Sequence, residues 1–222
     1  FEIFAEDVVF YKKLRVPPPT FCPDCRSQRR LAHRVSFLPI FYKKPCSAPG
    51  HGEPVITFHP PESSVKVFDD KYYLSDAWEA TEYGRDCDPQ KSFFEQFQKL
   101  ALDIPNQTLF KDPQSIDCDY TISGAHSKNC YYLAVPFYSE DVYYGFLPPY
   151  AKNCVDVVVL ANSEFCYRSA ESERLYNCNF VYESNSCVDS SFLYDCRNCS
   201  NCFGSTNLRH KQYYFLNQPL TK

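Results

Sequence analysis

The stretch SKNCYYLAVPFY, residues 127–138, is one copy of a twelve-residue unit that repeats through the second half of the chain. It follows SIDCDYTISGAH and precedes SEDVYYGFLPPY, AKNCVDVVVLAN and SEFCYRSAESER. A shortened row, LYNCNFVYE (175–183), comes next, and the last row is the degenerate LRHKQYYFLNQP (208–219). A short fixed period of this kind predicts stacked units that bury their apolar faces against one another.

The fourth position is the most regular part of each row. It holds Cys118, Cys130, Val142, Cys154, Cys166, Cys178, Cys187 and Cys199. Positions four and eight have the parity of one strand face, so we expect both to point inward. The third position is mostly Asn or Asp, which is typical of a bend. We therefore predict a mainly β fold: a C-terminal β-solenoid of 12-residue repeats with an N-terminal zinc-ribbon-like segment and one or two capping helices.

The size of the coil follows from the bulk of the side chains. A twelve-residue coil leaves little interior for the many Tyr and Phe residues, and it would need disulfides to hold it. We therefore expect two rows per coil, or about 24 residues, with strands ~4.8 Å apart. The shortened row should pinch one turn without shifting the fourth-position phase after it.

Three segments are expected along the chain. Residues 1–60 form an N-terminal helix and zinc-ribbon-like head, residues 61–110 connecting strands and a capping helix, and residues 111–222 the β-solenoid repeats. The head begins with a helix from Glu6 to Leu14, which has acids in its first turn and lysines in its last. The strongest helical pattern lies within residues 86–104, with Ser92 and Glu95 at capping-box spacing and Pro105 as its end.

The aromatic stripe of that helix is expected to be core. Phe93, Phe94 and Phe97 fall on one face. The open end of a solenoid exposes unpaired backbone and apolar side chains, so we expect this helix to cover it.

Composition limits the class of protein. With 222 residues and 44% hydrophobic content, the chain can bury a core. Thirteen cysteines cannot all pair internally, so we expect a reducing, cytoplasmic compartment with metal-bound cysteines near the start and free buried ones in the repeats. No apolar run approaches the ~18 residues of a membrane span, so no membrane association is expected. The chain has no Met and begins at Phe1, so we expect its original start to be missing or processed away.

The strongest metal motif is C-x2-C followed by C-x4-H. Cys22 and Cys25 present two thiolates from one turn, and Cys46 and His51 complete a tetrahedral zinc site. Four protein ligands make this a structural site. His59 or His33 could replace His51 as the fourth ligand, and an ordinary buried CxxC turn is the alternative.

Basic residues follow the CxxC motif. They are Arg26, Arg29, Arg30 and Arg34, with Lys43 and Lys44 arriving later. An arginine guanidinium can form two hydrogen bonds to one phosphate group at once, which suggests contact with RNA. Residues 1–60 carry nine basic and five acidic residues, a balance of +4, against −8 for the rest of the chain. A solvated helix face, or arginines docked on the acidic repeats, is the alternative, and a pI near 5.7 argues against a dedicated nucleic-acid protein.

Enzyme motifs are missing from the sequence. It contains no Gly-rich phosphate loop, no GxSxG and no HExxH, so we expect no enzymatic activity. Cys196, Cys199 and Cys202 have the spacing that opens an iron–sulfur motif, but they also fit the repeat as stacked solenoid cysteines. Asp69, Asp70, Asp76 and Glu79 surround Trp78, and we interpret them as a polar loop around a buried tryptophan.

Several stretches together resemble one cysteine-rich family. They are PPPTFCPDCRSQRRLAHR, VFDDKYYLSDAW, YGRD, FFEQF, the NCYYL-type rows and SSFLYDCRNCSNCFGSTNLRHKQYYFLNQ. The family is common in bacteria of the candidate phyla radiation and has no established activity. The resemblance implies a bacterial origin and a zinc-ribbon-like head, and it carries over no catalytic residues.

Three functional hypotheses follow. The first is a non-enzymatic, zinc-stabilised interaction module that binds a protein or ribonucleoprotein assembly, with RNA contacted by the basic head. The second is a structural or scaffold protein that self-associates through solenoid faces or ends. The third is a redox or metal-cluster protein that uses the C-terminal cysteines.

Overall fold

The computed structural model describes residues 1–32, 40–110 and 112–220, which belong to two compact units, 1–37 and 38–222. The first unit contains α1 (Ala5–Lys13) and α2 (Pro23–Ala32). Helix α1 confirms the helix expected from the charge pattern, with acids in its first turn and lysines in its last. The residues predicted as one head, 1–60, thus fall in both units.

The second unit begins with two small sheets and three short helices. Strand β1 (Tyr42–Pro45) pairs antiparallel with β2 (Pro54–Thr57), and β3 (Val67–Phe68) pairs parallel with β4 (Asn106–Gln107). Between β3 and β4 the chain forms α3 (Asp70–Tyr73), the 3-10 helix η1 (Ala80–Tyr83) and α4 (Phe93–Asp103). Their small core consists of Cys46, Ala48 and Phe68 with Val55, Tyr72, Tyr73 and Trp78 packed around them.

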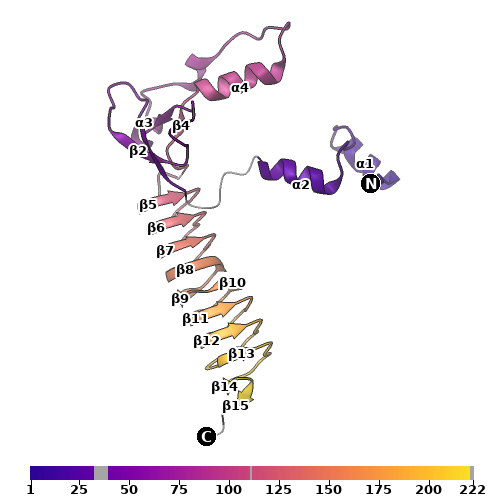
Figure 1. The fold of residues 1–222 in the computed structure, drawn as a ribbon, viewed down its shortest axis with the longest axis vertical. Coiled ribbons are helices and arrows are strands. Elements are labelled where there is room, and N and C mark those ends of the chain that lie inside the picture. Colours follow the sequence, from indigo (N-terminus) through magenta and orange to yellow (C-terminus); the bar gives the residue numbers. More distant parts are fainter. Residues whose placement is uncertain (33–39, 111, 221–222) are drawn as a thin grey trace. The chain divides into compact units, whose positions relative to one another are not determined.

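The remainder of the second unit is a β-solenoid of about 8 turns, which confirms the predicted fold class. Its parallel strands stack one after another along a single column (Figure 1). They are β5 (Ile116–Ile122), β6 (Lys128–Ala134), β7 (Glu140–Phe146), β8 (Lys152–Ala161), β9 (Glu164–Tyr167), β10 (Ala170–Glu173), β11 (Tyr176–Tyr182), β12 (Val188–Tyr194), β13 (Phe203–Thr206) and β14 (Tyr214–Phe215), with β15 (Gln218–Pro219) antiparallel to β14.

One coil holds a single twelve-residue row. Cys118 pairs with Cys130, and Tyr176 pairs with Val188, so each residue stacks on the residue twelve positions later. The prediction of two rows per coil was therefore wrong. It assumed that bulky aromatic residues need interior space, whereas most of them point outward.

Side chains that point inward recur every three residues, each one directly after a corner of the coil. Every third residue from Asp117 to Leu216 has a positive φ near 50–60°, including Gly204, and each such residue turns the chain by one corner. The residue after each corner is inward and, from Cys118 to Leu208, almost always buried. Four sides of three residues therefore make one coil. The eighth position is off this phase, which explains why Val158 and Phe203 are 43% and 48% exposed. The prediction that this position points inward therefore fails for these rows, although Ile122 and Ala134, at the eighth position of the first two rows, are buried.

The interior holds leucine, valine and cysteine side chains together with small polar ones, and the polar ones bond the backbone. Ser163 Oγ donates to the carbonyl of Ala161 at 2.8 Å and accepts the Leu175 N–H at 3.0 Å. The thiol of Cys154 donates to the carbonyl of Lys152 at 3.1 Å in the same way. Serine and cysteine thus both donate to main-chain carbonyls inside the coil, and serine in addition accepts an N–H from the next coil; the cysteines are free thiols.

The shortened row does not pinch a turn, contrary to the prediction. Cys178 pairs with Ser190, so the twelve-residue coil continues unchanged. Cys187 lies nine residues after Cys178 and therefore occupies a different side of the coil. The shortened row lacks three residues, which is the length of one side of the coil. The cysteines after it therefore lie on a different side but still point inward.

Helix α4 is formed as predicted, but its aromatic stripe is not core. None of its residues is buried, and Phe94 is 77% exposed. Ser92 is the N-cap residue, although its side chain makes no capping hydrogen bond. The first coil is instead bonded by the segment before it: Leu109, which is buried, accepts the Ser123 N–H at 3.3 Å.

This packing makes a prediction about thiol reactivity. In native, metal-free, reduced protein we expect Cys22, Cys25 and Cys87 to react quickly with a thiol reagent, because the other ten cysteines are buried. The ten should react only after denaturation. Mass spectrometry after pulse labelling measures this, and rapid modification of the solenoid cysteines would contradict the described interior.

Candidate metal centre

The first half of the predicted zinc motif lies at the start of α2. Pro23 is the first helical residue, a position that suits proline, and this sets Cys22 just before the helix and Cys25 in its first turn. The Cys25 N–H donates to Cys22 Sγ at 3.4 Å. This hydrogen bond, followed by that from the Cys25 thiol, lowers the pKa of Cys22. The turn therefore presents two thiols, one of them more readily ionised, as a metal ligand pair requires.

The second half lies in the other unit, beside an aspartate. Cys46 follows β1, and its N–H bonds to the Glu53 carbonyl at 3.2 Å. His51 lies on the turn between β1 and β2, directly after Gly50, whose φ of 77° suits glycine. Asp69 precedes α3 and caps it by accepting the Tyr72 N–H at 3.0 Å.

These three side chains converge on one another. His51 Nδ1 lies 2.7 Å from Asp69 Oδ2, and Cys46 Sγ lies 3.6 Å from the same oxygen. The Asp69 N–H also donates to Cys46 Sγ at 3.3 Å. In the part of the chain that the structure describes, this is the one group in which three candidate ligand atoms lie within 4.8 Å of one another. A thiol and an imidazole suit zinc better than the hard cations magnesium or calcium.

The surroundings keep Asp69 ionised. Burial is the largest single influence on its pKa and raises it, but the Tyr72 N–H, the Cys46 thiol and His51 together outweigh burial, so the pKa is lowered. The cluster borders a cavity of about 380 Å³ that is also lined by Gly50, Gly52 and Glu53. Cys46 is buried, whereas the His51 side chain is 43% exposed. The sulfur side of the site is thus buried, and the imidazole side is accessible from the cavity.

The predicted ligands are thus found as two pairs. Cys46 and His51 are neighbours in the second unit, and Cys22 and Cys25 are neighbours in the first. The alternative ligand His33 lies outside the described residues. His59, the other alternative, is not in the cluster; its Nε2 is buried without a hydrogen-bond partner, and burial followed by the charge of Lys44 lowers its pKa.

Sequence reasoning missed Asp69 as part of this centre. It grouped Asp69 with the acids around Trp78, although an Asp before a short helical run is also the pattern of an N-cap. Trp78 does pack in the small core, where its Nε1–H donates to the Tyr73 carbonyl at 2.9 Å.

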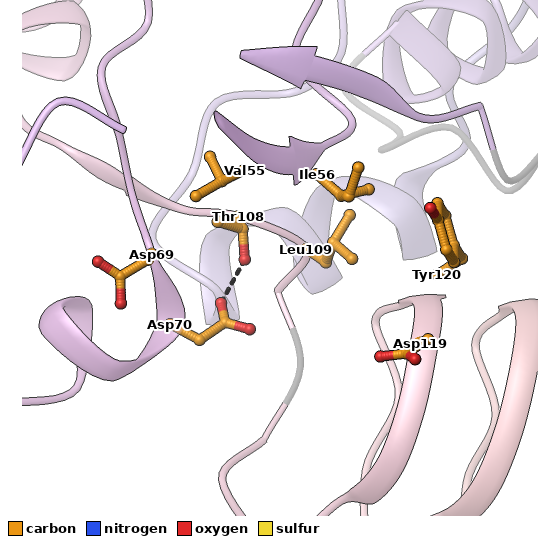
Figure 2. Close-up of a pocket in the computed structure, with 8 residues that line it drawn as sticks. All are labelled: Val55, Ile56, Asp69, Asp70, Thr108, Leu109, Asp119 and Tyr120. Carbon is orange, nitrogen blue, oxygen red and sulfur yellow. Dashed lines mark hydrogen bonds between the residues drawn. The ribbon is translucent and has the colours of Figure 1, made fainter. Parts of the chain in front are cut away.

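The neighbouring residue Asp70 has a different environment. It lines a second cavity, of about 230 Å³, together with Val55, Ile56 and Thr108, among others; Asp69 lines this cavity too. Figure 2 shows Thr108 hydrogen-bonded to Asp70, with the Asp69 carboxylate turned away from this pair. The two adjacent aspartates therefore have separate roles, and only Asp69 belongs to the candidate metal centre.

The predicted basic residues differ in whether their side chains already make contacts within the chain. Arg26, Arg29 and Arg30 lie on α2, and the Arg29 guanidinium lies 4.6 Å from the centre of the Phe21 ring. Lys44 Nζ donates hydrogen bonds to the carbonyls of Ser63 and Val65 at 2.6 and 2.7 Å. Its ammonium group therefore has a structural role within the fold. Lys43 on β1 is exposed. Arg34 lies outside the described residues.

The C-terminal cysteines point into the coil. Cys196, Cys199 and Cys202 occupy three successive sides, are buried, and donate to main-chain carbonyls. Burial raises the pKa of Cys178 to about 11 and that of Cys187 to about 12, so these two thiols stay protonated at neutral pH. This arrangement agrees with the interpretation of these residues as stacked solenoid cysteines.

An exposed aromatic face runs along one side of the solenoid. We define the aromatic face as Tyr120, Tyr131, Tyr132, Tyr144, Tyr167, Phe180, Phe192, Phe203 and Phe215. Neighbouring rings contact one another from Tyr120 to Tyr144 and again from Tyr167 to Phe215. The ring of Phe41, just before β1, packs edge-on against Tyr120 and Tyr132 at 5.5 and 5.2 Å. The first part of the face thus already accepts an aromatic side chain from outside the solenoid.

No family model and no curated protein matches this chain, so its function has to be inferred from its own residues. Among the described residues, no helix is both long enough and apolar enough to cross a membrane.

Proposed function

We propose that this protein is a non-enzymatic, zinc-stabilised interaction module that binds a partner in a protein or ribonucleoprotein assembly. The observation that carries the proposal is the aromatic face. Aromatic side chains are enriched at protein interfaces, where their large area is buried at low entropic cost. A stacked solenoid holds them in a fixed row, which favours an extended partner surface.

The contact of Phe41 indicates how a partner would bind. Phe41 covers the first rings of the face, whereas Phe192 near the other end is 49% exposed. A partner carrying aromatic side chains could repeat the Phe41 contact along the free rings. Edge-to-face ring pairs of this kind contribute about 0.5–1.5 kcal/mol each beyond their buried area.

We assign zinc to the head, with Cys22, Cys25, Cys46 and His51 as its ligands. The support is local: a hydrogen-bonded CxxC turn in one unit, and a thiol beside an imidazole in the other. Four protein ligands give zinc a structural role in which it stabilises the head. Free thiols throughout the solenoid favour a reducing, cytoplasmic location.

Photocrosslinking tests the aromatic face. We expect p-benzoylphenylalanine in place of Phe192 to yield a discrete covalent adduct with a different protein in cells expressing the full chain. The matched control carries the same group in place of Tyr150, which is 56% exposed on the opposite side of the coil. Adducts from Phe192 alone support the proposal. Equal labelling from both positions, or no adduct, contradicts it, and an adduct with a second copy of this chain favours self-association instead.

The ribonucleoprotein part of the proposal depends on the arginines of α2. We expect a fluorescein-labelled single-stranded oligouridylate to bind the full chain, with an affinity that falls steeply as salt rises. Arg29→Ala with Arg30→Ala should weaken binding and make the slope of log K against log salt shallower by about 1.4. Lys12→Ala with Lys13→Ala removes the same charge from α1 and is the control. Fluorescence anisotropy measures both, and an equal effect of the two double variants would reject a specific role for α2.

A further inference from the structure

The Asp69 carboxylate is fully engaged by protein donors. Its Oδ1 accepts the Tyr72 N–H, and its Oδ2 lies 2.7 Å from His51 Nδ1 and 3.6 Å from Cys46 Sγ. Both oxygens are therefore already in use, and the residue holds two candidate zinc ligands at once. Its role depends on whether it would itself bind the metal or orient the groups that do.

The distance between Asp69 and His51 favours the second of these roles. Two ligands at about 2.0–2.1 Å from a tetrahedral zinc lie about 3.3 Å apart. The observed 2.7 Å is shorter and falls in the range of a charge-assisted N–H···O hydrogen bond. His51 therefore donates Nδ1–H to Asp69, which leaves Nε2 as the nitrogen with a free lone pair.

A second contact reaches the cysteine. The Asp69 N–H donates to Cys46 Sγ at 3.3 Å, as the Cys25 N–H does to Cys22 Sγ at 3.4 Å. The hydrogen bond from the Asp69 N–H therefore fixes the position of the Cys46 sulfur beside the carboxylate that holds His51. Because Asp69 also caps α3, its main chain and carboxylate are held rigidly.

We propose that Asp69 is an outer-sphere positioning residue of the zinc centre. Its carboxylate holds His51 so that Nε2 binds the metal, and its N–H holds the sulfur of Cys46 in position. This inference rests on the zinc-stabilised head proposed above. It assigns the ligand nitrogen of His51 and distinguishes Asp69 from a fifth ligand.

The direct test is the ligand nitrogen of His51 in the intact, zinc-loaded protein. Long-range ¹H–¹⁵N correlation spectra of ¹⁵N-histidine-labelled full chain distinguish a protonated Nδ1 from a metal-bound Nε2. We expect His51 to carry a proton on Nδ1 and zinc on Nε2. Zinc on Nδ1 would overturn the inference, because Nδ1 would then be unable to donate to Asp69.

Substitutions provide a second test. Removing an outer-sphere carboxylate lowers metal affinity by roughly 10–100-fold, so we expect Asp69→Ala to lose affinity in that range in a chelator competition. Asp69→Asn, which keeps an oxygen acceptor and a good helix cap, should lose less. Glu53→Gln removes a carboxylate from the same cavity and should leave the affinity unchanged.

Cobalt substitution separates an outer-sphere role from ligation. With Co²⁺ in place of zinc, Asp69→Ala should keep the visible absorption bands of the wild type, since the ligand atoms are unchanged. Altered bands, or an unchanged zinc affinity in Asp69→Ala, would overturn the inference while the zinc-stabilised head stands. A wild-type chain that binds no zinc would overturn both proposals.

Discussion

The narrow interior of the twelve-residue coil is the constraint on which the rest of the solenoid depends. Each side has three residues, and the chain turns at every third residue with a positive φ. This conformation costs non-glycine residues roughly 1–2 kcal/mol. Hydrogen bonds between coils offset the cost: at one such corner the Val135 N–H bonds to the Ile122 carbonyl at 2.8 Å, and at the next Tyr138 bonds to Ala125 at 3.0 Å. The interior then has room only for small or slender side chains. At Gly145 a Cβ would lie 2.3 Å from the Val157 carbonyl oxygen.

This constraint places the thiols inside the coil and most aromatic rings on its outer surface. Serine and cysteine fit inside and donate to backbone carbonyls, whereas most tyrosine and phenylalanine side chains point outward; Tyr214, in the last coil, packs against the core. The abundance of cysteine therefore reflects packing, and the aromatic rings are left on the outer surface, where the centres of the Phe180 and Phe192 rings lie 4.6 Å apart. The candidate metal centre belongs to the region before the solenoid, where Cys46 is buried in a separate small core. It lies beside a histidine and an aspartate, with a cavity next to them.

The sequence was sufficient to predict the solenoid, α1 and α4, because a fixed repeat and helical charge patterns are local signals. It was insufficient for the coil length, because the bulky aromatic residues were expected to need interior space. It was also insufficient for the inward positions, because the alternation of a flat strand does not apply where every third residue turns a corner. Val158 at the eighth position illustrates the error. Asn and Asp at the third position indicated a bend, but Tyr132 and Val159 adopt the same left-handed conformation without any such signal. Asp69 was missed because it is distant in sequence from Cys46 and His51, and only the fold brings it to them.

Removing one coil tests the central claim most directly. Deletion of residues 152–163 joins Ala151 to Glu164, which keeps every later residue in the same phase. The account predicts a protein that still unfolds cooperatively in denaturant and still protects its C-terminal cysteines from thiol reagents. Deletion of residues 152–161 instead brings outward residues inside, and it should expose those cysteines. Equal behaviour of the two deletions would contradict a twelve-residue coil with three residues per side.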